Sequence, residues 1–223
     1  MSSQQSGSAL QAAVATEKIT ITKPPLGSPI KRTYTFRVKR YDPERGGGYY
    51  WREYKIELSN HETVLDGLIK IKWYQDATLS FRYSCRMGGI CGSCGMIING
   101  TPRLACETKP YDLGTEVITV EPLSNFEPIK DLAADFSEFF SKHRSVRPWL
   151  IRKDETEQFE KLESYYPQTE EQLSEYLEFA YCIKCGLCYS ACPMVFLNRD
   201  YLARKPLPRP IGGVRIIGMR EPC

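Results

Sequence analysis

The sequence predicts an α+β protein of two domains, a strand-rich N-terminal domain followed by a helical one. Alternating apolar residues and turn signals predict strands and one helix over residues 31–124. From residue 125 onward, apolar residues recur at helical spacing instead. Eight cysteines form two dense groups, one in each of these parts. A chain of 223 residues with 42% hydrophobic residues can bury a core in each of two modest domains.

The N-terminal domain begins with a predicted β-hairpin and a helix. Apolar and polar residues alternate over residues 34–38 and again over residues 54–58, with a glycine-rich turn between them. Thr63 and Asp66 form a helix-capping pair, and apolar side chains then recur on one face of residues 64–73. We therefore expect two strands followed by a short helix.

More strands follow this helix. The pattern predicts a strand over residues 79–83 and a hairpin with strands at 96–98 and 103–106, joined by the strong turn signal Asn99-Gly100. Residues 116–120 read as the last strand. The order strand, strand, helix, strands favours a β-grasp domain over residues 31–124.

The rest of the chain differs in composition. Apolar residues recur at helical spacing from Ile129 to Phe140, and residues 162–166 and 173–180 suggest further helices, which predicts an all-α domain over residues 125–198. Residues 1–30 offer few core side chains, and we expect a disordered arm. Residues 199–223 form a tail rich in Pro, Gly and Arg that cannot sustain a helix.

Composition also limits the function classes. A net charge of +3 without a block of like charges gives no indication of nucleic-acid binding. No apolar stretch reaches the roughly 18 residues of a membrane-spanning helix. The first 30 residues have neither the apolar core of a secretory signal nor the arginines of a mitochondrial presequence. We therefore expect a reducing compartment, in which clustered cysteines bind metal rather than form disulfides.

The first cysteine group has the pattern C-x5-C-x2-C-x11-C. Its members are Cys85, Cys91, Cys94 and Cys106. A two-iron cluster needs four thiolates that converge on a small inorganic core, and a glycine-rich loop lets backbone amides approach the sulfurs. The loop has glycines at 88, 89, 92 and 95, and the predicted strand brings in the fourth cysteine. The plant-type pattern has four residues between its first two cysteines, whereas this chain has five.

The second group has the pattern C-x2-C-x2-C-x3-C-P of bacterial ferredoxins. Its members are Cys182, Cys185, Cys188 and Cys192, followed by Pro193. The first three would bind one cubane, and the fourth cysteine of such a run serves another cluster. Cys223 is the one further cysteine downstream, so these clusters lack ligands within the chain. The second domain is then truncated, completed by a partner subunit, or occupied by one incomplete cluster.

Two other functions fit these cysteines. Zinc could fold two small domains on eight thiolates and yield an interaction module without redox chemistry. A truncated, non-functional fragment of an electron-transfer subunit is the other. No acid-base pair or nucleophile stands out, so we predict no catalytic residue and expect the chain to carry electrons while a partner performs the substrate chemistry.

The chain resembles the iron-sulfur subunit of succinate dehydrogenase and quinol:fumarate reductase over about residues 31–198. The resemblance rests on both cysteine motifs in this order and on these segments: 84–87, 91–96, 104–108, 129–132 and 145–150. It implies a plant-type ferredoxin fold for the N-terminal domain and a bacterial ferredoxin-like fold for the helical one. It also implies a chain of clusters that carries electrons between a flavin and a quinone.

The resemblance further implies ligands, partners and location. Cys85, Cys91, Cys94 and Cys106 would bind a [2Fe-2S] cluster, Cys182, Cys185 and Cys188 a [4Fe-4S] cluster, and Cys192 a [3Fe-4S] cluster. The partners would be a FAD-containing catalytic subunit, membrane anchor subunits and quinone, with no nucleic acid. We expect a peripheral protein on the cytoplasmic side of a prokaryotic cell membrane. The sequence leaves succinate oxidation and fumarate reduction both open.

The chain departs from the family's pattern in three places. The first loop has an extra glycine, and the family's second C-terminal cysteine run is absent. After Cys192-Pro193, where the family commonly has tryptophan near the quinone, this chain has Phe196 and Leu197.

Overall fold

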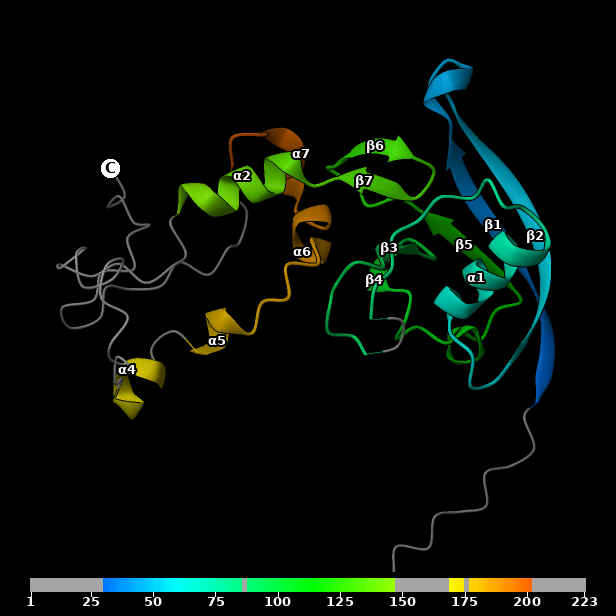
Figure 1. The fold of residues 1–223 in the computed structure, drawn as a ribbon, viewed down its shortest axis with the longest axis horizontal. Coiled ribbons are helices and arrows are strands. Elements are labelled where there is room, and N and C mark those ends of the chain that lie inside the picture. The colour runs from blue at the N-terminus through cyan, green and yellow to red at the C-terminus, as the bar shows by residue number, and fades with distance from the viewer. Residues whose placement is uncertain (1–29, 86–87, 147–168, 175–176, 202–223) are drawn as a thin grey trace, which may run out of the picture.

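The computed structural model describes residues 30–85, 88–146, 169–174 and 177–201. Its N-terminal part is a five-stranded mixed sheet in the order β2-β1-β5-β3-β4, with helix α1 packed on it (Figure 1). The central pair, β1 and β5, is parallel, and the other strand pairs are antiparallel. This mixed sheet with one crossing helix agrees with the predicted β-grasp order and with the α+β class.

The first hairpin is confirmed. Strand β1 (Lys31–Tyr41) pairs with β2 (Tyr49–Ser59) in a register that sets Phe36 opposite Tyr54. A 3-10 turn, η1 (Pro43–Arg45), connects them, and Gly46 ends it in the left-handed conformation that glycine adopts without steric cost. Alternate residues of both strands are buried against α1, so the two-residue period of the sequence corresponds to one face of the sheet.

Helix α1 (Val64–Tyr74) starts at the predicted capping pair. The Thr63 hydroxyl accepts a hydrogen bond from the Asp66 amide at 3.2 Å, and the Asp66 carboxylate accepts one from the Thr63 amide at 2.8 Å. Its apolar face lies in the core of the sheet. At Gly67 a β-carbon would lie 2.5 Å from the Phe36 ring, so the absent side chain lets the helix approach β1 closely.

The later strands confirm most of the pattern. β3 (Gly95–Ile98) and β4 (Thr101–Leu104) form the hairpin around Asn99-Gly100, and β5 (Val117–Glu121) follows a second 3-10 turn, η2 (Pro110–Leu113). The strand predicted over residues 79–83 does not form. That segment is irregular, and it uses Leu79 as a core residue without pairing to a neighbouring strand.

The prediction of a helix from Ile129 to Phe140 is wrong for the first residues of that range. Residues 127–135 form a second, two-stranded sheet, with β6 (Glu127–Lys130) paired to β7 (Ala133–Asp135). In a tight hairpin, residues close to the turn that are three positions apart in the sequence can face each other, as Lys130 and Ala133 do. The apolar spacing of such a hairpin therefore resembles that of a helix. Leu132 from its turn is buried in the core of the N-terminal domain. The helix begins later, at α2 (Ser137–Ser145).

The remaining elements are short helices. They are α4 (Glu170–Ser174), α5 (Leu177–Ala180), α6 (Leu187–Ser190) and α7 (Pro193–Leu197). α4 and α5 confirm helical structure in most of residues 173–180, whereas the helix expected at 162–166 lies outside the described residues. α2, α6 and α7 lie next to one another in Figure 1. Their small shared core consists of Phe139, Tyr189 and Val195. None of the described helices is long and apolar enough to cross a membrane.

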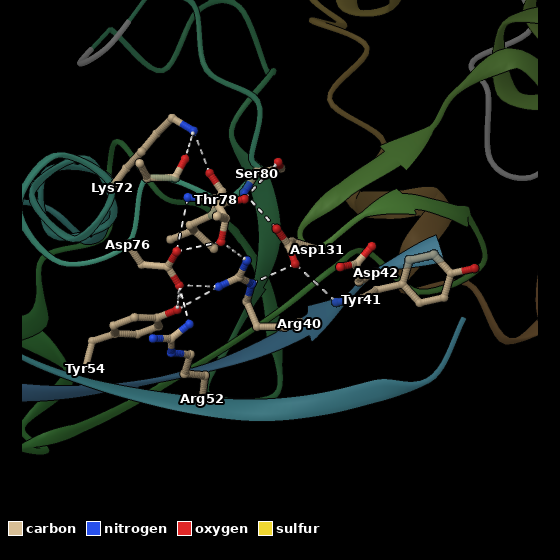
Figure 2. Close-up of polar contacts among 12 residues, drawn as sticks. Arg40, Tyr41, Asp42, Arg52, Tyr54, Lys72, Asp76, Thr78, Ser80 and Asp131 are labelled. Atoms are coloured by element: carbon tan, nitrogen blue, oxygen red, sulfur yellow. Dashed lines mark hydrogen bonds and ion pairs between the residues drawn. The ribbon is translucent and has the colours of Figure 1, made fainter. Parts of the chain in front are cut away.

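A buried ion-pair network joins the second sheet to the first. The Arg40 guanidinium donates to the Asp131 carboxylate at 2.7 Å and to the Asp76 carboxylate at 2.6 Å (Figure 2). Arg40 is 2% exposed and Asp131 is fully buried, so neither charge is solvated by bulk water. Asp131 also accepts from the backbone amides of Tyr41 and Ser80. The β6–β7 hairpin is thereby fixed to β1.

Around Asp76 the network shifts two pKa values. Burial by itself would raise the pKa of the Asp76 carboxyl, but hydrogen bonds from Thr78, Tyr54 and Arg40 outweigh it and lower the pKa well below its usual range. Burial, together with the hydrogen bond to Asp76, raises the pKa of Tyr54 to about 12. Asp76 therefore stays ionised and Tyr54 stays protonated at neutral pH.

Candidate functional site

The first cysteine group lies on a loop and on the adjoining β3–β4 hairpin. Backbone amides approach its sulfurs: those of Cys85 and Ser93 lie 3.4 and 3.5 Å from Cys91 Sγ, and that of Cys106 lies 3.5 Å from Cys94 Sγ. The structure thus brings together Cys85 with Cys91, and Cys94 with Cys106. N–H groups directed at sulfur stabilise thiolates, which is the form that binds metal.

Cys85 and Cys94 have opposite electrostatic environments. Backbone N–H groups of Cys91, Ile90 and Gly88 lower the pKa of the exposed Cys85 thiol to about 6. Burial raises the pKa of the Cys94 thiol to about 12. Cys94 is thus protonated at neutral pH unless a positive ion compensates the lost solvation.

The fourth cysteine is fixed by helix α1 as well as by the sheet. The amides of Val64 and Leu65, at the start of α1, donate to the carbonyls of Thr108 and Ala105 at 2.8 and 3.1 Å. These carbonyls flank Cys106 in the turn after β4. Because the first N–H groups of a helix have no partner within the helix, this turn both satisfies them and becomes rigid.

The second cysteine group curls around two residues with left-handed backbone. Lys184 has φ 57° and Gly186 has φ 77°, which turns the chain between successive cysteines. Cys188 lies within α6, and its pKa is raised first by partial desolvation and then by the negative charge of Cys185 and Cys182. Cys192 caps α7, with Pro193 at the first position of the helix.

One side chain outside the cysteine motifs fixes this segment. Asn125 Nδ2 lies 3.0 Å from the Tyr189 carbonyl oxygen and 3.1 Å from those of Ser190 and Cys192. The first two carbonyls lie in the last turn of α6, and the third lies at the start of α7. Asn125 itself has φ 64°, a conformation that asparagine tolerates better than most residues. The linker after β5 thus holds the run that carries the last cysteine.

The two cysteine groups contact each other directly. A β-carbon at Gly92 would lie 2.7 Å from Cβ and 2.8 Å from Cα of Cys185, so the backbone of the first loop packs against this residue. Ile183, Cys185 and Leu187 pack against the core of the N-terminal domain. All eight predicted ligands lie among the described residues, in two groups that meet at Gly92 and Cys185.

The side chains do not form a closed metal cage. In residues 30–85, 88–146, 169–174 and 177–201, no three Cys, His, Asp or Glu side chains lie close enough together to hold an ion. Cys223 is outside these ranges. After Cys192, Phe196 and Leu197 are exposed at 78% and 75%.

The sequence reasoning missed Asn125 and the contact at Gly92. Asn125 bonds to residues 64 to 67 positions away, and no local pattern announces such a bond. The glycines of the first loop were noted for their approach to sulfur, whereas Gly92 makes room for another part of the chain. A stacked pair, Phe126 and Phe136, with ring centroids 4.4 Å apart, also lies against Gly186 and was not foreseen.

Family models match both cysteine-bearing parts of the chain. Residues 35–141 match a 2Fe-2S iron-sulfur cluster binding domain, and residues 176–197 match a 4Fe-4S binding domain. These matches bear out the expected iron-sulfur cofactors.

Among curated proteins, the fumarate reductase iron-sulfur subunit of Mycobacterium tuberculosis is 47% identical over 165 residues, which cover 74% of this chain and 65% of that protein. The fumarate reductase iron-sulfur subunit of Haemophilus influenzae is 38% identical, and the match covers 66% of its length. The mitochondrial succinate dehydrogenase [ubiquinone] iron-sulfur subunit 1 of Oryza sativa is 40% identical over 173 residues and covered to 60%. The chain thus spans slightly less than two thirds of these relatives.

A solved structure is similar as well. A chain of the Mycobacterium smegmatis Sdh1 complex in the apo form superposes with a TM-score of 0.66 at 30% identity, covering 78% of this chain and 69% of that one. The chain belongs to the family of iron-sulfur subunits of succinate dehydrogenase and fumarate reductase.

Proposed function

We propose that this chain is the electron-transfer subunit of a succinate dehydrogenase or fumarate reductase. It carries electrons between a FAD-containing catalytic subunit and a membrane quinone, and the substrate chemistry belongs to the catalytic subunit. The observation that carries the proposal is the direct contact between the two cysteine groups at Gly92 and Cys185. Two separate zinc-stabilised modules would have no need of that contact.

The ligand assignment is part of this proposal. Cys85, Cys91, Cys94 and Cys106 hold a [2Fe-2S] cluster, Cys182, Cys185 and Cys188 contribute to a [4Fe-4S] cluster, and Cys192 contributes to a [3Fe-4S] cluster. When bound, these clusters supply one-electron storage at each site.

The residues around the cysteines fit such groups. Backbone N–H groups of Cys85, Ser93 and Cys106 lie within 3.5 Å of cysteine sulfurs, as thiolate ligands require. The loop glycines let the backbone come close. Among the described side chains, the buried hydroxyl of Ser190, two residues away from both Cys188 and Cys192 in the sequence, has no hydrogen-bond partner.

The domain division and the location complete the proposal. Residues 31–124 form the [2Fe-2S] domain and residues 125–198 a predominantly helical domain for the other clusters, with the arm 1–30 and the tail 199–223 outside them. The β6–β7 hairpin at 127–135 belongs to the connection between the two domains. The protein lies on the cytoplasmic side of a prokaryotic membrane, held there by anchor subunits.

Electron paramagnetic resonance on the anaerobically purified, dithionite-reduced chain tests this function, together with iron, sulfide and zinc analysis. We expect a rhombic two-iron signal and additional iron. Cys94→Ser should abolish the two-iron signal, whereas Cys185→Ser should leave it and reduce the remaining iron. A colourless protein that is silent in resonance and contains stoichiometric zinc would overturn the proposal.

A further inference from the structure

Two glycines of the first cysteine loop face the same residue of the second group. At Gly92, a β-carbon would lie 2.7 Å from Cβ of Cys185, and at Gly95 it would lie 3.1 Å from the Cys185 carbonyl oxygen and 3.2 Å from Leu187 Cδ2. Carbon atoms in ordinary contact are about 3.5–4.0 Å apart. A side chain at Gly92 therefore cannot fit without separating the two segments.

Backbone conformation alone does not explain these glycines. Gly92 has φ 70°, but Gly100 and Gly114 have similar φ values of 76° and 67°, and a β-carbon there would meet no atom within 4 Å. Gly95, in strand β3, does not have positive φ. What Gly92 and Gly95 share is the contact with Cys185.

We propose that Gly92 and Gly95 are positioning residues that set the distance between the two cysteine groups, and that the electron passes between the groups through the contact of Gly92 with Cys185. This inference rests on the proposed function. With clusters bound, one electron would leave the cluster of one group and enter that of the other, in either direction and without proton transfer.

The surroundings determine which segment moves when this contact is enlarged. The first group is held by the sheet, by helix α1 and by the buried Cys94 and Cys106. The turn that carries Cys185 is only half-buried. A methyl group at Gly92 should therefore push the second group outward by roughly 1 Å, the difference between the gap available and a normal contact. Electron tunnelling and magnetic dipolar coupling both fall steeply with such a displacement.

The first test compares Gly92→Ala with Gly114→Ala in the cluster-containing protein. Both substitutions put alanine at positive φ and so share the backbone strain, but the Gly92 variant alone adds the contact. We expect unchanged iron content and two-iron signal in both, with weaker spin–spin interaction between the reduced clusters and slower intercluster electron transfer in Gly92→Ala. If both variants contain both clusters and show the same spin–spin interaction and the same rate of intercluster electron transfer, the inference is refuted while the proposed function stands.

The second test does not depend on clusters. In the metal-free chain, alkylation of Cys185 by iodoacetamide is followed by peptide mass spectrometry. Gly92→Ala should raise the rate severalfold because it uncovers the thiol, and Gly114→Ala should leave it unchanged. Gly95→Ala, which introduces no backbone strain, should give a smaller rise. Identical rates in all variants would show that the contact does not cover Cys185 and would overturn the inference even if no cluster can be loaded.

Discussion

The first and second cysteine groups differ in how the fold holds them. The first is supported by a five-stranded sheet, a capped helix and two buried thiols. The second is carried by four- and five-residue helices and held by one asparagine and an aromatic cluster. The first group is therefore positioned by extensive secondary structure, whereas the second depends on a few long-range contacts that single substitutions can remove.

Asp131→Ala should have the largest effect, because it removes the acceptor of Arg40 and of the Tyr41 and Ser80 amides inside the protein. Breaking a buried ion pair costs about 3–5 kcal/mol. Urea denaturation should show this loss in the free energy of unfolding. The exposed Asp112→Asn is the control and should stay within about 0.5 kcal/mol. A loss of similar size in both variants would contradict the role of the network.

Acid should produce the next effect, again in the sheet domain. The pKa of Asp76 is lowered in the folded protein, so the unfolded state binds more protons at acid pH and stability falls as pH drops below about 5. Tyr54 acts at the other end: with its pKa raised to about 12, stability falls as pH rises beyond about 10.

The pH dependence can be assigned with two variants. The free energy of unfolding, measured from pH 2 to 11, should lose much of its acid slope in Asp76→Asn and much of its alkaline slope in Tyr54→Phe. If Asp76→Asn keeps the full acid slope, other carboxylates are responsible.

Asn125→Ala should cost about 2 kcal/mol, because the amide that bonds the last turn of α6 and the start of α7 is removed. The loss should be confined to the second group, so iron bound there should fall while the two-iron signal persists. Asn125→Gly is the matched variant, since glycine keeps the positive φ and removes only the side chain. If Asn125→Gly binds iron like the unmodified chain, the hydrogen bonds do not hold the second group.

Tyr189→Phe should have the smallest effect, about 1 kcal/mol. The Tyr189 hydroxyl donates to Glu138 at 3.1 Å and accepts from Lys142 at 3.0 Å, but Glu138 and Lys142 keep their own pair at 2.7 Å without it. Thermal unfolding should show a shift of a few degrees. A collapse of the helical region would mean that the hydroxyl, and not the ring against Phe126 and Phe139, holds α6 to α2.

Local signals in the sequence predicted the features that depend on local structure. The Asn99-Gly100 turn, the Thr63–Asp66 cap and the strand alternation over residues 34–38 and 54–58 each depend on a few neighbouring residues, and the structure confirms them. The cysteine spacings predicted the two groups for the same reason.

The features that were missed depend on residues far apart in the chain. Arg40 bonds to Asp131 over 91 positions, and nothing near either residue indicates the partner. The hairpin at 127–135 was mistaken for a helix because its apolar spacing is common to both structures. The sequence indicates only that Gly92 lets the backbone approach a cysteine sulfur. It does not indicate the contact of Gly92 with Cys185, because these residues are close only in the folded chain.

The position of β1 in the sheet also affects synthesis of the protein. β1 is the first strand to be made, but two of its partners are made much later. Its parallel partner β5 pairs Val117 with Thr35, and Asp131 binds Arg40 of β1. At about 5–20 residues per second, Arg40 has left the ribosome's catalytic centre roughly 5–20 s before its partner is made. Until β5 and Asp131 are made, the hairpin β1–β2 has an unpaired edge at β1, and Arg40 has Asp76 but lacks the second of its two buried carboxylate partners. The sheet can therefore be completed only after residues 117–131 have been made, although its first hairpin consists of residues 31–59.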